Sequence, residues 1–132
     1  MTFRKLVLKS GKTALAGKSA ENNEELIRQV GREEIVLHTE KPGSPFVNIK
    51  AGRKEISKKD LREAAVFCSA YSQAWKKDKV KREVVVHWFN GEEIFKTKLM
   101  KTGTFGVKKA RKINVKKSEI INFEESIKDG AD

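Results

Sequence analysis

The longest helix-forming segment of the chain, residues 57 to about 75, is flanked on both sides by short strand-like segments. Ser57 followed three residues later by Asp60 is the pattern of a capping box, which begins a helix. Apolar and small side chains then recur at helical spacing, as at Leu61 and Ala65, so one face of the helix is predicted to pack on a sheet. Helices and strands do not alternate regularly, which favours an α+β fold with a mixed, mostly antiparallel sheet, one long helix and one short helix.

The short helix is predicted between Ser19, a good N-cap residue, and Gly31, a good terminator. The run VVVHWF at residues 84–89 is apolar enough to indicate a buried strand. Turn residues separate the remaining strand-like segments. These strands are predicted at residues 3–8, 13–16, 35–39, 46–50, 94–98, 104–109 and 113–115.

The length of 132 residues suits one domain. We expect a single domain over residues 1–118, followed by an acidic C-terminal tail, residues 119–132, that is partly ordered at most. No apolar run is long enough to cross a bilayer, and the N-terminal segment does not resemble a signal peptide. The expected location is therefore the cytoplasm, without a membrane partner.

The residues that usually bind metals or cofactors are few. Cys68 is the only cysteine, and its spacing from His38 and His87 does not match a zinc site. Neither common glycine-rich phosphate-binding pattern occurs. We therefore expect no metal and no cofactor, and we interpret Cys68 as a small buried apolar residue.

The positive charge of the chain is concentrated in two segments. The formal net charge is +11. Residues 1–18 contain five cations and no acid, and residues 94–118 contain nine cations and no acid. Blocks of one sign are typical of surfaces that bind polyanions, although a crowd of solvated lysines would give the same count. The two blocks form one RNA-binding surface only if they lie on the same face.

Both prolines of the chain lie in the stretch HTEKPGSPF, residues 38–46. Pro42 and Gly43 suit the corner positions of a type II turn, and Pro45 marks the start of the following strand. Two prolines hold such a turn in one conformation, so little entropy is lost when it binds a ligand. We expect His38, Lys41 and the backbone amides of Gly43 and Ser44 to contact that ligand.

His38 could also act as a general base, because histidine titrates near neutral pH. No nucleophile lies at a defined spacing from it, and a lone histidine on an apolar strand is more often structural. The predicted protein is therefore not an enzyme. An RNA-modifying or RNA-processing enzyme that uses His38 is kept as an alternative, as is an adaptor that binds proteins on the ribosome.

Four blocks of sequence resemble the NFACT-R domain, the RNA-binding module of the NFACT proteins of ribosome quality control. They are GKSAENNEELIRQV, EIVLHTEKPGSPFVNIK, LREAAVFCSAYSQAWK and the two segments KT and TGTFGVKKARKI, and together they run from about Gly17 to Ile113. The resemblance implies a stand-alone module that binds structured RNA, either ribosomal or transfer RNA, and an association with the ribosome. Relatives carry an insertion between the residues equivalent to Thr97 and Thr102, where this chain has four residues, so contacts of that insertion are not carried over.

The motif positions that match the family are Asn22, Glu25, His38, Pro42, Gly43, Ser44, Lys96, Thr97, Thr102, Gly103 and Phe105. Phe105 is the aromatic residue that we expect to stack on an exposed base. The predicted RNA-binding residues are Lys12, Lys18, His38, Lys41, Gly43, Ser44, Lys96, Lys98, Lys101, Phe105, Lys108, Lys109, Arg111 and Lys112.

Overall fold

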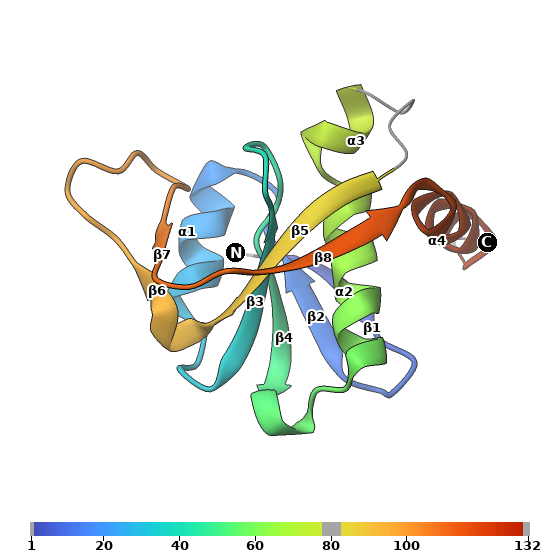
Figure 1. Cartoon of the computed structure of the whole chain (residues 1–132), viewed down its shortest axis with the longest axis horizontal. Coiled ribbons are helices and arrows are strands. Elements are labelled where there is room, and N and C mark those ends of the chain that lie inside the picture. The colour runs from blue at the N-terminus through green and yellow to red at the C-terminus, as the bar shows by residue number, and fades with distance from the viewer. Residues whose placement is uncertain (1, 78–82, 131–132) are drawn as a thin grey trace.

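The computed structural model describes residues 2–77 and 83–130 and has a twisted six-stranded sheet at its centre (Figure 1). Every neighbouring pair of strands in this sheet is antiparallel. The strand order is β1-β2-β4-β3-β5-β8. The strands are β1 (Arg4–Val7), β2 (Thr13–Ala16), β3 (Glu34–Thr39), β4 (Val47–Gly52), β5 (Glu83–Asn90) and β8 (Arg111–Lys116).

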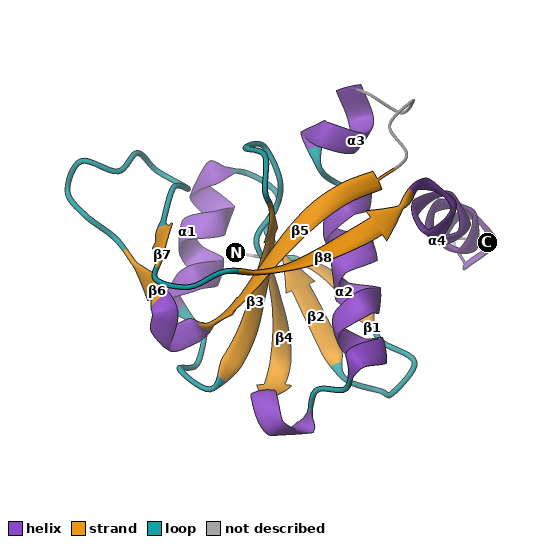
Figure 2. Ribbon diagram, viewed as in Figure 1, coloured by secondary structure: helices purple, strands orange, loops and turns teal. Residues whose placement is uncertain are grey.

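Two helices cover one face of the sheet, α2 (Lys58–Ala70) and α4 (Lys117–Gly130), as Figure 2 shows. Side chains that alternate along the strands, such as Leu37 and Val86, pack under α2 and form the main core. From α4, Ile120 is fully buried and the ring of Phe123 lies 5.9 Å from that of Phe67. The segment expected to be a partly ordered tail thus forms a helix that contributes to the core.

The opposite face is covered by α1 (Ala20–Arg28) and by a short two-stranded ribbon, β6 (Ile94–Phe95) with β7 (Gly106–Val107). Leu26 of α1 is completely buried against Val36, Phe46 and Phe89, which form a second, smaller core. Burial of such side chains is the main source of stability for a helix of only nine residues.

The predicted α+β class is confirmed, and local signals placed the helix starts well. The hydroxyl of Ser57 accepts from the backbone N–H of Asp60, and the Asp60 carboxylate accepts in return from the N–H of Ser57, which is the predicted capping box. Ser19 likewise caps α1. The predicted long helix ends at Ala70, and its expected last residues form a separate short helix, α3 (Gln73–Lys77). The helix α4 was not predicted.

The two basic blocks of the sequence do not lie on adjacent strands. β1 and β8 form opposite edges of the sheet, so their cations cannot form one continuous strip across neighbouring strands. In the part of the chain that the structure describes, no helix combines the length and apolar character needed to cross a membrane.

Candidate nucleic-acid interface

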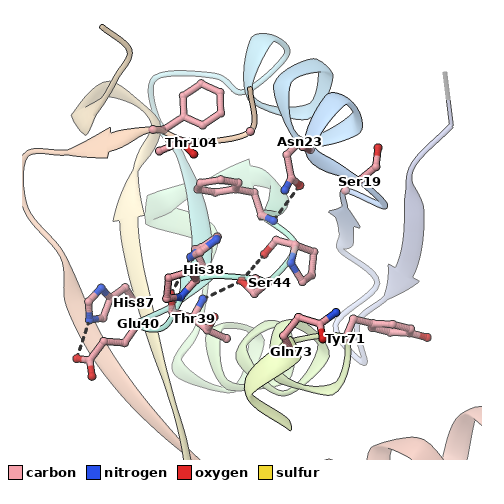
Figure 3. A pocket seen from close by; sticks show the side chains of 18 of the residues that line it. Ser19, Asn23, His38, Thr39, Glu40, Ser44, Tyr71, Gln73, His87 and Thr104 are labelled. Atoms are coloured by element: carbon pink, nitrogen blue, oxygen red, sulfur yellow. Dashed lines mark hydrogen bonds and ion pairs between the residues drawn. The ribbon is translucent and has the colours of Figure 1, made fainter. Parts of the chain in front are cut away.

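A cleft of about 790 Å³ opens between the start of α1, the β3–β4 turn and the segment that leads into β8 (Figure 3). His38 lies near its centre and Thr104 approaches from another side, and Phe46 and Phe105 also line it. The cleft therefore combines three segments that are distant in the sequence. Five predicted site residues line it: Lys18, His38, Gly43, Ser44 and Phe105.

The β3–β4 turn is rigid because its polar groups are bonded within the protein. Gly43 has φ = 87°, the left-handed conformation expected for the glycine of a type II turn, and its carbonyl accepts from the N–H of Gln73 at 2.7 Å. The Ser44 hydroxyl accepts from the N–H of Thr39 and donates to the carbonyl of Pro45, both at 3.0 Å. Ser44 is buried, so its hydroxyl holds the turn together, and a ligand contact by the backbone amides of Gly43 and Ser44 stays a prediction.

The His38 ring is held in one orientation and one tautomer. Its Nδ1 lies 2.7 Å from the carbonyl oxygen of Thr39, which can only accept, so Nδ1 carries the proton. Nε2 is then a hydrogen-bond acceptor. The ring also packs on Phe46 with centroids 4.4 Å apart. Burial lowers the pKa of His38 because the charged form loses solvation, and the hydrogen bond to Thr39 opposes this effect only in part.

A network of charges lies at the mouth of the cleft on β5 and β8. Glu40 binds Nζ of Lys112 at 3.0 Å and Nε2 of His87 at 3.2 Å. These two partners, Lys112 foremost, lower the pKa of the Glu40 carboxyl. Its negative charge is thus largely compensated, which lowers the electrostatic barrier to an anion at this side of the cleft.

The loop between β6 and β7 is fixed by Lys96. The Nζ atom of Lys96 donates to Glu24 of α1 at 2.7 Å and to the loop carbonyls of Lys101 and Thr104 at 2.6 and 2.7 Å. Glu24 also accepts from the N–H of Gly103. Gly103 has φ = 80° and lies so close to Ala20 that a Cβ atom would collide with it, which explains the glycine at this motif position.

Phe105 ends this loop and lies against the rest of the cleft wall. Its ring meets Phe46 edge-on at 5.5 Å between centroids, and Lys96 Nζ lies 4.5 Å from its centre. Part of the ring is therefore already covered by protein.

Glu25, which matches the family motif, only pairs with Arg28 on the surface, whereas the neighbouring Glu24 holds the loop.

The predicted cations fall into two groups. Several are committed to acidic partners: Lys12 with Asp60, Lys96 with Glu24, Arg111 with Glu93 and Lys112 with Glu40. The others are exposed and form no salt bridge among the described residues, although Lys109, after Arg111, helps to lower the pKa of the Glu93 carboxyl. They are Lys18, Lys41, Lys98, Lys101, Lys108 and Lys109.

Two of these lysines lie at the cleft, and Lys12 does not; Lys98, Lys101, Lys108 and Lys109 belong to the segment 98–109, of which residues 103–105 and Val107 line the cleft. Lys18 lines the cleft directly and Lys41 lies in the turn that forms its wall. Lys12 lies at the opposite end of α2, beside Asp60. Since α2 has 13 residues, about 20 Å of helix separates that end from the cleft. The structure therefore assigns Lys12 a role in holding the β1–β2 hairpin to α2.

Sequence reasoning missed several residues of the cleft. Asn23 accepts from the N–H of Phe46 at 3.1 Å and ties α1 to the turn. Tyr71 and Gln73 follow α2 and line the cleft, as do Arg4 and Lys76. Tyr71 and Gln73 stand in the SAYSQ sequence of a recognised block, but only the break in the helix after Ala70 turns them toward the cleft.

Cys68 has the environment of an inert thiol. It is fully buried near Ser44 and Pro45, and burial raises the pKa of its thiol to about 12. The thiolate, which is the reactive form, is therefore suppressed. The interpretation of Cys68 as a small buried residue is confirmed.

The fold and the cleft together define a small α+β domain with a partly apolar, lysine-flanked site. The family described as "NFACT protein RNA binding domain" matches residues 2–109, and the chain belongs to this family. The resemblance found in the sequence is thereby confirmed.

Two individual proteins are similar to this chain, one in sequence and one in fold. The chain is 33% identical over 107 residues to the archaeal Rqc2 homolog aRqcH of Methanocaldococcus jannaschii, which covers 77% of this chain and 16% of that protein. The C-terminal part of the fibronectin/fibrinogen-binding protein from Streptococcus suis matches with a TM-score of 0.79 at 18% identity, over 92% of this chain and 49% of that one. This chain thus spans a small part of the first relative and about half of the second.

Proposed function

We propose that this protein binds structured RNA, transfer RNA or ribosomal RNA, through the cleft and the unpaired lysines around it. The observation that carries the proposal is the separation of the cations. Among the predicted RNA-binding cations, those committed to carboxylates stabilise the fold, while Lys18 and Lys41, which form no salt bridge among the described residues, lie at the cleft and in the turn that forms its wall. Lysines free of carboxylates release counterions when they meet phosphates, which gives affinity without base specificity.

The membership in an RNA-binding family supports the ligand class. The similarity to an archaeal Rqc2 homolog supports a role in ribosome quality control, with the ribosome as a partner and the cytoplasm as the location. In this proposal the rigid HTEKPGSPF turn contributes the shape of the cleft wall, with Lys41 as its cation. The hydroxyl of Ser44 acts indirectly, because it keeps the turn in position.

Catalysis is not part of the proposal. Nδ1 of His38 is committed to a backbone carbonyl, and among the described residues no serine, threonine or cysteine side chain is hydrogen-bonded to the ring. A histidine that activates a nucleophile of the protein is expected to be hydrogen-bonded to it. The proposal therefore gives His38 a role in recognition.

The direct test measures the affinity of the purified protein for transfer RNA, for structured fragments of ribosomal RNA and for duplex DNA over a salt series. The proposal predicts tighter binding to RNA and affinity that falls steeply with salt, by about 0.7 to 0.9 in log–log slope for each phosphate contact. Equal affinity for duplex DNA, or affinity independent of salt, would contradict it. Product formed from any of these RNAs and lost in His38→Ala would establish the enzyme instead.

A further inference from the structure

The cleft has the size and the chemistry of a site for a single nucleotide. Its volume of about 790 Å³ lies within the usual range for small-molecule sites. Phe46, Phe89 and Phe105 give it an apolar wall, while Lys18 and Lys76 are exposed cations at its edge. A flat base against apolar rings with a phosphate near the lysines satisfies both parts, which a continuous duplex cannot do because its bases are stacked inside.

Nε2 of His38 is the polar atom of the central ring that remains for a ligand. The proton on Nδ1 is fixed by the Thr39 carbonyl, and this is the only hydrogen bond of the ring found among the described residues, so Nε2 is left without a partner there. The ring cannot turn freely, because Phe46 packs on it. The cleft therefore presents a preorganised acceptor, and it selects for a ligand group that donates.

RNA differs from DNA at the 2′-hydroxyl, which can donate a hydrogen bond at every nucleotide whatever its base. An acceptor that meets this hydroxyl distinguishes RNA from DNA without reading sequence. Recognition of the 2′-hydroxyl suits this cleft, because its described lysines can contact phosphates but cannot distinguish RNA from DNA. Glu40, the one carboxylate among the described residues that line the cleft, is already paired with Lys112 and His87 and is not a free acceptor.

We propose that the cleft binds one unstacked nucleotide of the RNA, and that Nε2 of His38 accepts a hydrogen bond from its ribose 2′-hydroxyl. This inference rests on the proposed RNA binding and adds the recognised unit and the recognising atom. An unpaired or bulged nucleotide fits best, because its base is already out of the stack and little energy is needed to place it in the cleft.

The test uses an RNA hairpin with a single bulged uridine and the same hairpin with 2′-deoxyuridine at the bulge alone. A third hairpin carries the deoxy substitution at a paired stem position and serves as the control. Loss of one neutral hydrogen bond should weaken binding of the bulge-substituted hairpin by about three- to tenfold. The stem substitution should leave the affinity of the wild-type protein unchanged.

Two substitutions of His38 show whether the effect belongs to Nε2. In His38→Asn the amide can still donate to the Thr39 carbonyl, but it places no acceptor where Nε2 lies. In His38→Gln the longer amide can reach that position. The difference between ribose and deoxyribose at the bulge should vanish in His38→Asn and return in part in His38→Gln. Melting temperatures check that both variants fold, and the wild-type comparison needs no variant.

Each result is decisive. Equal binding of the bulged ribose and deoxyribose hairpins by the wild type, or a difference that persists in His38→Asn, overturns the nucleotide inference and leaves general RNA binding intact. Failure to bind any hairpin overturns the proposed function together with the inference. Both proposals are supported if affinity falls only when the bulged nucleotide lacks its 2′-hydroxyl, and only in proteins that keep an acceptor at the position of Nε2.

Discussion

Replacement of Asp60 by Asn should destabilise the protein strongly, because this carboxylate is the buried centre of a polar network. Asp60 is 1% exposed. It accepts from the Ser10 hydroxyl at 2.6 Å and from the Ser57 N–H at 3.0 Å, and it pairs with Nζ of Lys12 at 3.0 Å. The Ser10 hydrogen bond contributes most to the low pKa of this carboxyl, and the Ser57 and Lys12 contacts add to it while burial opposes it.

The magnitude follows from what each substitution removes. Hydrogen bonds to charged groups contribute about 1.5–3 kcal/mol each, and breaking a buried ion pair costs about 3–5 kcal/mol. Since asparagine keeps one acceptor, Asp60→Asn should lower the free energy of unfolding by about 2–4 kcal/mol. Lys12→Ala should cost only about 1 kcal/mol, because the serine contacts remain and the lysine side chain is 24% exposed.

Urea unfolding of both variants measures these differences, with Lys9→Ala as the matched control. Lys9 lies in the same hairpin, is exposed and has no ion pair among the described residues. Its replacement should change stability by less than about 0.5 kcal/mol. The folded pKa of Asp60 is lowered, so its contribution is complete above the ordinary value of 3.8 and is lost as the pH falls below it.

The same variants separate the fold from RNA binding. Lys12→Ala should leave the affinity for RNA and its salt slope unchanged, whereas Lys18→Ala, at the cleft, should lower the slope by about 0.7 to 0.9. If Lys12→Ala left stability intact and weakened RNA binding as much as Lys18→Ala, our assignment of Lys12 to the fold would be refuted.

Three further predictions concern the cleft. Lys96→Met removes the donor to Glu24 and to two loop carbonyls, so the free energy of unfolding measured in urea should fall by about 1–2 kcal/mol. Glu24→Gln keeps an acceptor for Gly103 and should lose less. A loss in Lys96→Met that is equal to or smaller than that in Glu24→Gln would argue against the Lys96 contacts. Because burial lowers the pKa of His38, the neutral ring contributes its full stability above pH 6.5 and less as the pH falls. The free energy of unfolding should therefore decline less steeply from about pH 7 to 5 in His38→Asn than in the wild type. An identical decline in both proteins would contradict the burial argument. Pro42→Ala with Pro45→Ala should weaken RNA binding in a titration while the free energy of unfolding falls by no more than about 1 kcal/mol per proline; a larger loss of stability with unchanged affinity would make the turn a fold element only.

Local chemistry in the sequence was enough to predict the elements that depend on neighbouring residues. The Ser57 and Asp60 capping box and the left-handed Gly43 are both found as predicted. These features need only a few consecutive residues, so their signal is present in the sequence itself.

Features that depend on distant residues could not be predicted in this way. The helix α4 lies in an acidic segment, and its stability comes from packing, with Ile120 buried against α2. The bond between Glu24 and Lys96 joins residues 72 positions apart. The order of the strands likewise placed β1 and β8 at opposite edges, which no local pattern indicates. The role of each lysine followed only from these long-range contacts.

The account depends most on the claim that RNA is bound by the unpaired lysines at the cleft and not by positive charge in general. The measurement compares two fourfold alanine variants with the same loss of charge. The first changes Lys98, Lys101, Lys108 and Lys109, in the segment whose residues 103–105 and Val107 line the cleft. The second changes Lys54, Lys58, Lys59 and Lys128, which are equally exposed, with the first three at the N-terminal end of α2.

Both variants are titrated with the same structured RNA over a salt series. We predict that the first variant loses most of its affinity and that its salt slope falls by about three, from four contacts at roughly 0.7 to 0.9 each. The second variant should keep nearly the wild-type slope, apart from a small loss through long-range attraction. Equal losses in the two variants would contradict the account, because the charge would then act without regard to the cleft.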